Sequence, residues 1–163
     1  MKIVITSDIH DNITNLKTCL DWCKKEKIET MICCGDLASL DTLEILSKNF
    51  PGQIHYVSGN MDYIYQDDAD DFSNISHHGE VGRVEIAGLN IGMCHQPFKF
   101  DRVLALGECD IVFYGHTHKP WEENKNGVRF VNPGTLSAMF SLATFAVFDT
   151  ERGEMELKVL NKL

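Results

Sequence analysis

Long hydrophobic runs are missing from this sequence of 163 residues. No apolar stretch approaches the roughly 20 residues that a helix needs to cross a bilayer, so we expect no membrane partner. The first apolar run, residues 3–5, stops at polar residues 6–8 and is too short for a secretory signal peptide. This run instead predicts a buried first strand.

Cysteine pairs at the spacing of a metal site are also missing. The sequence has six cysteines, but no C-x-x-C pair occurs among them. Cys19 and Cys23 are four residues apart on a predicted helix, and Cys33 and Cys34 are adjacent within a predicted strand. We interpret the six as buried, reduced thiols of a cytoplasmic protein and not as disulfides or zinc ligands.

Positive charge is scarce. The chain has 15 Lys and Arg residues against 24 Asp and Glu residues, a formal net charge of −9. This balance argues against a groove for duplex nucleic acid, which needs clustered Lys and Arg. A pair of bound divalent cations would still create a locally positive site in such an acidic protein.

The N-terminal half contains an alternation of strand and helix patterns. Apolar, β-branched runs predict strands at residues 2–7, 30–34 and 53–58. Between them, helical spacing predicts one helix from Ile13 to Cys23, capped by Asp11 or Asn12, and another over residues 40–46. A polar residue follows each strand, at the sheet edge where open α/β sheets usually bind ligands.

Strand patterns dominate the C-terminal half. They predict strands at residues 83–87, 89–94, 110–114, 128–131, 143–148 and 155–160, with one helix at 98–106. Residues 63–79, which include aspartates 67, 68, 70 and 71, are interpreted as a solvated irregular loop; His77 and His78 there have no partner at ligand spacing. This order predicts two packed sheets with helices outside, in a single domain over residues 1–163.

Side chains that can bind metals follow the predicted strands. Asp8 and His10 form a D-x-H pair, and two later histidines form an H-x-H pair. In an extended chain residues two apart point to the same side, so each pair aims two donors at one place. Each residue alone is an ordinary turn or cap residue. Together they predict one metal centre with the ligands Asp8, His10, Asp36, Asn60, His95, His116 and His118.

These donors are imidazole nitrogens, carboxylates and one amide oxygen, without a thiolate. Such a set suits Mn, Ni, Co, Fe or Zn better than Cu(I) or Ca²⁺, and we expect Mn first. Seven donors are too many for one tetrahedral ion with an open position. The set therefore favours two divalent ions that share a carboxylate.

Six short blocks carry a resemblance to a known family: Ser7-Asp8-Ile9-His10, Gly35-Asp36, Gly59-Asn60-Met61-Asp62, His95, Gly115-His116-Thr117-His118 and Asn132-Pro133-Gly134-Thr135. In order and approximate spacing they resemble the calcineurin-like metallophosphoesterases, especially their short phosphodiesterase-type branch, over essentially the whole chain. The resemblance implies an α/β fold, a four-layer α/β/β/α sandwich of two mixed sheets flanked by helices.

The resemblance also implies roles for the seven ligands. Asp8, His10 and His118 would hold one ion, Asn60, His95 and His116 the other, and Asp36 would bridge the two. Asp36, Asn60 and His95 would thereby be catalytic, since a hydroxide between the ions would attack the phosphorus of a small phosphoester in line.

Two positions depart from the family pattern. Many members of the wider superfamily have His where this chain has Met61, and that His is thought to assist the leaving group. Met cannot donate a proton, which predicts slow hydrolysis of alkyl phosphomonoesters and faster hydrolysis of phosphodiesters with good leaving groups. Gln96 stands where many relatives have Gly and would crowd or hydrogen-bond the pocket. Residues 132–135 are interpreted as a supporting turn.

Three functions compete. The first is a phosphodiesterase or phosphatase. The second is a protein-interaction scaffold on the same fold, which resembles the retromer coat subunit with its degraded site. The third, a metal-sensing or nucleotide-binding regulator, has no dedicated feature in the sequence. Competent donors at all seven ligand positions favour the enzyme, and Met139 and Phe140 could support self-association.

Overall fold

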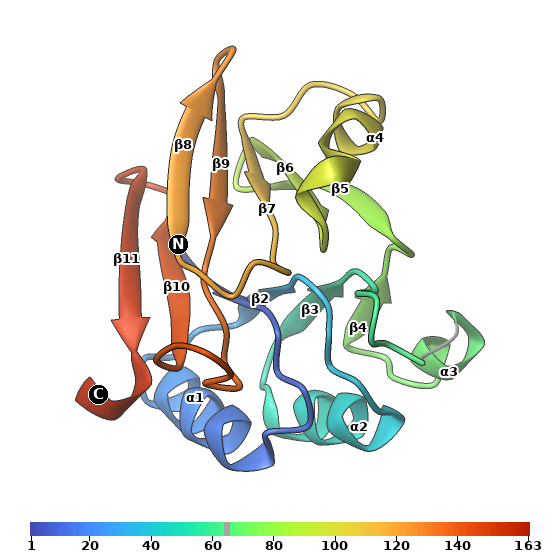
Figure 1. The fold of residues 1–163 in the computed structure, drawn as a ribbon, viewed down its shortest axis with the longest axis vertical. Coiled ribbons are helices and arrows are strands. Elements are labelled where there is room, and N and C mark those ends of the chain that lie inside the picture. Colours follow the sequence, from blue (N-terminus) through green and yellow to red (C-terminus); the bar gives the residue numbers. More distant parts are fainter. Residues whose placement is uncertain (64–65) are drawn as a thin grey trace.

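The computed structural model describes residues 1–63 and 66–163, except for the side chains of residues 66 and 67. Two mixed sheets lie at its centre (Figure 1). The first contains β1 (Lys2–Thr6), β2 (Thr30–Cys33), β3 (Gln53–Tyr56), β4 (Ile75–His77), β10 (Thr144–Asp149) and β11 (Glu154–Val159). The second contains β5 (Val81–Ile86), β6 (Leu89–Cys94), β7 (Ile111–Phe113), β8 (Trp121–Lys125) and β9 (Val128–Asn132).

The strand order brings the ends of the parallel strands together. The first sheet runs β11-β10-β1-β2-β3-β4, with β1 to β4 parallel and β10 antiparallel to β1. The second runs β5-β6-β7-β9-β8, with β6, β7 and β9 parallel. Because parallel strands share a carboxyl edge, the segments that follow them meet at that edge.

Helices cover the outer faces of the sheets. They are α1 (Ile13–Lys25), α2 (Leu40–Asn49), α3 (Gln66–Asp70) and α4 (Phe100–Leu104), with short 3-10 turns at Pro97–Lys99 and Leu160–Lys162. The Asn12 side chain caps α1 by accepting from the backbone N–H of Asn15 at 3.1 Å. The predicted capping role of Asn12 is thus confirmed.

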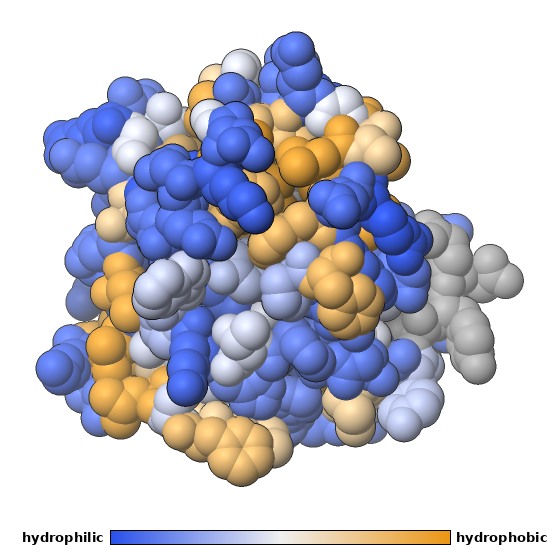
Figure 2. All heavy atoms as spheres, turned by 45° about the horizontal axis from the view of Figure 1, so that its top comes forward, coloured by the Kyte–Doolittle hydropathy of each residue, from blue (hydrophilic) through white to orange (hydrophobic). Residues whose placement is uncertain are grey.

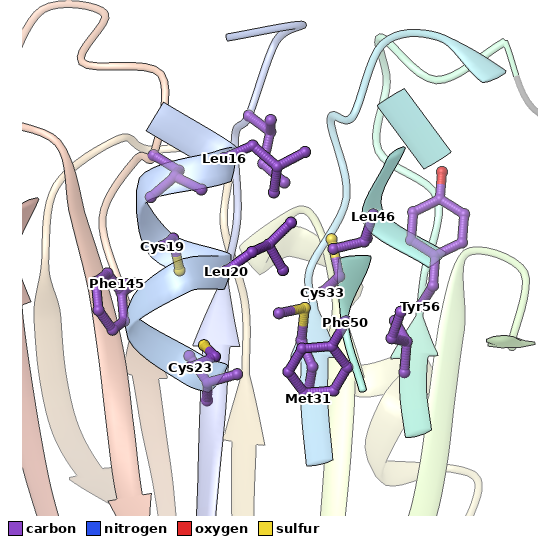
Figure 3. Packing of buried hydrophobic residues seen from close by; sticks show 14 of the residues in the cluster. Leu16, Cys19, Leu20, Cys23, Met31, Cys33, Leu46, Phe50, Tyr56 and Phe145 are labelled. Carbon is purple, nitrogen blue, oxygen red and sulfur yellow. The ribbon is translucent and has the colours of Figure 1, made fainter. Parts of the chain in front are cut away.

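Three buried clusters separate four layers. Val4 and Met31 of the first sheet face α1 and α2, as Figure 3 shows for Met31 and the surrounding side chains. Their neighbours Ile5 and Ile32 point the other way, into the space between the two sheets. A third cluster, which includes Val103 of α4, lies on the far side of the second sheet. Successive side chains of these strands thus face opposite sides of the sheet, and the resulting four layers confirm the predicted α/β/β/α sandwich.

All six cysteines are free and buried, as predicted. Cys19 and Cys23 of α1 and Cys33 of β2 lie among the packed apolar side chains of Figure 3. Burial raises the pKa of the Cys33 thiol to about 12. The Cys33 thiol therefore stays protonated near neutral pH, as a structural residue does.

Some predicted elements were wrong. Residues 63–79 are not simply irregular, because α3 and β4 lie there; Ile64, Tyr65 and the side chain of Asp67 are outside the described residues. The expected helix at 98–106 is split into a 3-10 turn and the short α4. The strand β8 was missed because its five side chains are polar or exposed and show no apolar alternation. Asn126-Gly127, both at positive φ, form the hairpin turn that could have revealed it.

The surface carries both polar and apolar residues. On the face in Figure 2, apolar residues form small groups between larger polar areas. Within the described part of the chain, no helix has both the length and the apolar character needed to cross a membrane.

Candidate metal centre

The predicted donors lie on segments that follow β1, β2, β3, β6 and β7, and these segments meet at one edge of the two sheets (Figure 1). Backbone hydrogen bonds join them directly. Asp8 N–H donates to Gly35 O at 3.0 Å, and Gly115 N–H donates to His95 O at 3.0 Å. Main-chain hydrogen bonds thus join the segments that carry the donors, and we call these joined segments the ligand frame.

Three donors form what we call the buried floor: Asp8, Asp36 and His95, whose exposed fractions are 0%, 2% and 0%. Asp36 Oδ2 lies 3.2 Å from His95 Nε2 and 3.6 Å from His10 Nε2. One carboxylate oxygen of Asp36 therefore lies near two histidines that come from different strands.

A second group forms around Asp8. Its Oδ1 lies 3.1 Å from His118 Nε2 and 3.8 Å from His10 Nε2. The two histidine Nε2 atoms are 3.4 Å apart. Ligand atoms of Asp8, His10 and His118, and likewise those of Asp8, Asp36 and His95, lie within 4.8 Å of one another. Asp8 thus belongs to both groups.

Unpartnered polar atoms show that a cation fits this site. Asp8 Oδ1 and His95 Nε2 are buried and have no hydrogen-bond partner among the described residues. His95 Nδ1 lies 2.7 Å from Cys34 O, a contact that needs the proton on Nδ1 and leaves Nε2 with a lone pair. Lone pairs and carboxylate oxygens then face one another, an arrangement that is costly without a positive charge between them.

The remaining donors lie outside the floor. Asn60 and His116 are exposed, and the His116 ring centroid is 5.2 Å from that of His95. Asn60 Oδ1 accepts from Gln96 Nε2 at 3.3 Å, so Gln96 hydrogen-bonds a predicted ligand. Met61 is 42% exposed, and its backbone N–H donates to Asp36 Oδ1 at 2.8 Å. We call Asn60, Met61 and His116 the exposed rim.

Charges within the site shift its pKa values. Burial raises the pKa of Asp36, but contact with His95 more than offsets this and the net shift is downward. Burial lowers the pKa of His95, but contact with Asp36 and the charge of Asp8 bring the net shift upward. Contact with Asp8 raises the pKa of His10, whereas burial and the charge of His95 lower that of His116. The upward shifts of the His10 and His95 pKa values show that the carboxylates favour a positive charge between them, and a metal cation bound there would compete with protons.

The backbone at the ligands differs from the expected extended chain. Positive φ angles of 45° to 70° occur at five predicted ligands: Asp8, His10, Asp36, His116 and His118. The D-x-H and H-x-H pairs thus converge through left-handed turns and not through strand alternation. Such conformations cost of order 1 kcal/mol or more for residues other than glycine and are concentrated at functional sites.

Two glycines allow these turns to cross at close range. A Cβ atom at Gly115 would lie 1.8 Å from Ser7 Oγ, and one at Gly59 would lie 2.1 Å from Asp36 Oδ1. A side chain at Gly115 would require Ser7 to move, and one at Gly59 would require Asp36 to move. The glycines of the G-N and G-H blocks are therefore explained by backbone packing against Asp8 and Asp36.

Supporting residues were partly missed by the sequence interpretation. Asp62 accepts from the backbone N–H groups of Asp36, Gly59 and Ala38 at 2.9, 2.7 and 2.8 Å, although only its place in the G-N-M-D block marked it. Asn132 Nδ2 donates to Gly115 O at 2.8 Å, as a supporting turn would.

The adjacent histidines of the middle segment do not join the site. His77 Nε2 lies 2.7 Å from Ser58 Oγ, and His78 Nε2 lies 3.2 Å from His55 Nδ1. Neither residue takes part in a three-donor group among the described residues.

Comparison with known proteins gives consistent matches. The model of the calcineurin-like phosphoesterase superfamily domain matches residues 1–153. Phosphodiesterase MJ0936 of Methanocaldococcus jannaschii is 30% identical over 98% of this chain and 99% of its own length. A solved archaeal phosphodiesterase has a TM-score of 0.87 at 29% identity, covering 98% of this chain and 99% of that chain. A single mutant of Vps29 from Entamoeba histolytica has a TM-score of 0.72 at 19% identity over 97% of both chains, a likeness of fold alone.

Proposed function

Because this chain belongs to the calcineurin-like phosphoesterase superfamily, we propose that it is a metal-dependent phosphoesterase that hydrolyses small phosphodiesters. The observation that carries the proposal is the pair of buried, unpartnered ligand atoms, Asp8 Oδ1 and His95 Nε2, at positions of the family motif. The name of the relative from Methanocaldococcus jannaschii supports a phosphodiester as substrate.

Seven residues would hold two divalent ions, with Mn expected first and Ni, Co, Fe or Zn as alternatives. Asp8, His10 and His118 would hold one ion, and Asn60, His95 and His116 the other. Asp36 would bridge them, which is supported by its Oδ2 lying near both His10 and His95. When bound, such ions lower the pKa of a water for in-line attack and stabilise charge on the phosphoryl oxygens.

The chain's own residues orient the ligands. Cys34 O fixes the ring of His95 through Nδ1, so that Nε2 points at Asp36. The Met61 N–H holds Asp36 Oδ1 and leaves Oδ2 directed at the histidines. The site therefore has its ligand atoms oriented by hydrogen bonds on their far sides, as metal sites usually require.

Met61 limits the leaving groups. Its exposed thioether stands at the sequence position where many superfamily members have a His that is thought to assist departure, and it has no proton to give. Aryl and other good leaving groups need no such help, whereas alkoxides do. We therefore propose phosphodiesters with good leaving groups as the better substrates and alkyl phosphomonoesters as poor ones.

The scaffold alternative rests on the fold that this chain shares with Vps29. Competent donors at all seven ligand positions favour the enzyme. The excess of acidic residues and the buried free cysteines support action in the cytoplasm on small molecules, without a duplex nucleic acid or a membrane as partner.

The test combines metal analysis with two assays. Bound metal is measured, and hydrolysis of bis-p-nitrophenyl phosphate and p-nitrophenyl phosphate is followed with added Mn, Ni, Co or Zn. Asp36→Asn and His116→Ala are assayed beside Asp41→Asn, an exposed carboxylate of α2 that serves as the control. We expect two ions per chain and a loss of roughly 100-fold or more in both site variants. Metal-free protein without hydrolysis under any ion would refute the enzyme.

A further inference from the structure

A hollow adjoins the metal centre on the side of the H-x-H loop. Its volume is about 280 Å³, and it is lined by His116, Thr117, His118, Lys119, Phe140 and Ser141. Two of these residues are predicted ligands, so whatever fills the hollow lies directly beside the reacting phosphate of the proposed function.

Phe140 forms one wall of this hollow. Its side chain is 92% exposed, the largest exposure among the bulky apolar residues that the structure describes. The ring centroid lies 6.0 Å from that of His118, with 34° between the ring planes. The residue also has a φ of +64°, a conformation unfavourable for a side chain of this size. Packing within the chain explains neither the exposure of this aromatic ring nor the strained backbone of the residue that carries it.

The segment that carries Phe140 is joined to the ligand frame. Ser141 Oγ donates to His118 O at 3.1 Å, and Ser137 N–H donates to Asp8 O at 3.0 Å. Thr135 Oγ1 also donates to Asp8 O, at 2.9 Å. The position of the Phe140 ring is therefore tied to the same backbone that positions Asp8 and His118.

The other walls are polar. The exposed residues Thr117 and Lys119 supply a hydroxyl and an ammonium group to the hollow. A flat apolar surface beside a cation and a hydroxyl suits a planar aromatic ring that is attached to an anionic phosphodiester. Offset stacking with Phe140 would add to the burial of such a ring.

We propose that this hollow is a subsite for a planar aromatic substituent of the phosphodiester, with Phe140 as its stacking surface. The inference rests on the proposed function and names the substrate class of that site: phosphodiesters that bear an aryl group or a nucleobase. In this proposal the aromatic ring of the substrate belongs to the substituent that remains bonded to phosphorus after hydrolysis.

The test keeps the leaving group constant. Ethyl, phenyl and thymidine-5′ esters of p-nitrophenyl phosphate all react with water in the same step: a water oxygen bonds to phosphorus, and p-nitrophenolate departs with the electron pair of its P–O bond. Only the retained substituent differs. We expect kcat/KM for the phenyl ester to exceed that of the ethyl ester by about fivefold, mostly through KM.

Two variants examine the Phe140 ring, and a third is their control. Phe140→Leu should bring the phenyl-to-ethyl ratio to about one, and Phe140→Tyr should retain it. Leu142→Ala is the matched control, because Leu142 is exposed in the same loop but lines a different hollow, with Asn15 and Leu160. A preference for the thymidine ester above the phenyl ester, lost in Phe140→Leu, would identify the ring as a nucleobase; equal preference would identify a general aryl subsite.

The same assays distinguish failure of the proposed function from failure of the subsite. If the wild type hydrolyses none of the three esters with any metal, the proposed function itself fails. If it hydrolyses them with a ratio that Phe140→Leu leaves unchanged, only the subsite is refuted. Light scattering at increasing protein concentration gives a further outcome: a dimer that Phe140→Leu dissociates would identify the ring as a self-association contact and overturn the subsite.

Discussion

The buried floor and the exposed rim of the metal centre differ in how the chain holds them. Asp8, Asp36 and His95 are inaccessible to solvent or nearly so, and their atoms are fixed by main-chain partners such as Cys34 O. Asn60 and His116 are exposed. The difference predicts that the floor residues, besides their proposed role as ligands, contribute to folding, whereas the rim residues can change with little cost to the fold.

Replacing one histidine of the buried floor and one of the exposed rim tests this difference most strongly. His95→Ala should lower the free energy of unfolding of the chelated, metal-free protein by roughly 2–4 kcal/mol, because it opens a cavity and removes the hydrogen bond from His95 Nδ1 to Cys34 O. His116→Ala should change it by less than about 0.5 kcal/mol, because its ring is exposed. Both should lower the rate of hydrolysis by roughly 100-fold or more. Urea denaturation with a chelator present gives the two values, and equal values would remove the distinction.

Asp62 provides the next largest effect. Asp62→Ala should cost about 1–3 kcal/mol of unfolding free energy, because three backbone N–H groups lose their acceptor. Asp62→Asn keeps one oxygen and should recover part of the loss. Urea denaturation measures both variants. If the alanine variant were as stable as wild type, the loops after β2 and β3 would be held by other contacts.

Met61→His tests the rim alone. The new imidazole can protonate a departing oxygen, so hydrolysis of phosphomonoesters with poor leaving groups should rise by up to about tenfold, with p-nitrophenyl esters nearly unchanged. Met61→Leu is the apolar control. A plot of log kcat/KM against leaving-group pKa measures the effect, and an unchanged slope in Met61→His would contradict the proposed role of this position.

The smallest effect concerns His55 and His78, outside both regions. Burial lowers the pKa of His78 from 6.5 to about 4, with the charges of His55 and His77 acting in the same direction, and burial lowers that of His55. A depressed folded-state pKa gives stability that is present above pH 6.5 and lost as the pH falls from 6.5 toward 4. Urea midpoints at pH 7.5 and 5 should therefore differ less in His78→Gln than in wild type, whether or not metal is bound.

The sequence predicted the fold well where side chains alternate between two apolar environments. Ile3 and Ile5 face one cluster while Val4 faces another, so the first strand was recognisable from composition alone. Strand β8 shows no such alternation, because its five exposed residues pair on one side with β9 and have no core to face. The sequence interpretation also missed β4, a three-residue strand whose pairing with β3 depends on tertiary contacts.

At the site, residue types were predictable and geometry was not. The order of the blocks pointed to Asp8, His10 and Asp36, but the expected extended backbone is replaced by left-handed turns there. Such turns are stabilised by neighbouring loops distant in sequence, which a single-chain pattern does not reveal. The role of Asp62 was missed for the same reason, because its three partners lie on two different loops.

The hydrogen bonds between the ligand loops have a consequence for how the protein acquires its metal. Backbone groups join the loop after β1 to the loop after β2, and the His95 segment to Gly115, so contacts of the main chain itself bring the donor segments together. If these contacts form before a metal binds, metal uptake follows folding. Which ion then occupies the site is decided by cellular supply and exchange rates after folding, so the metal content of purified protein should vary with the growth medium.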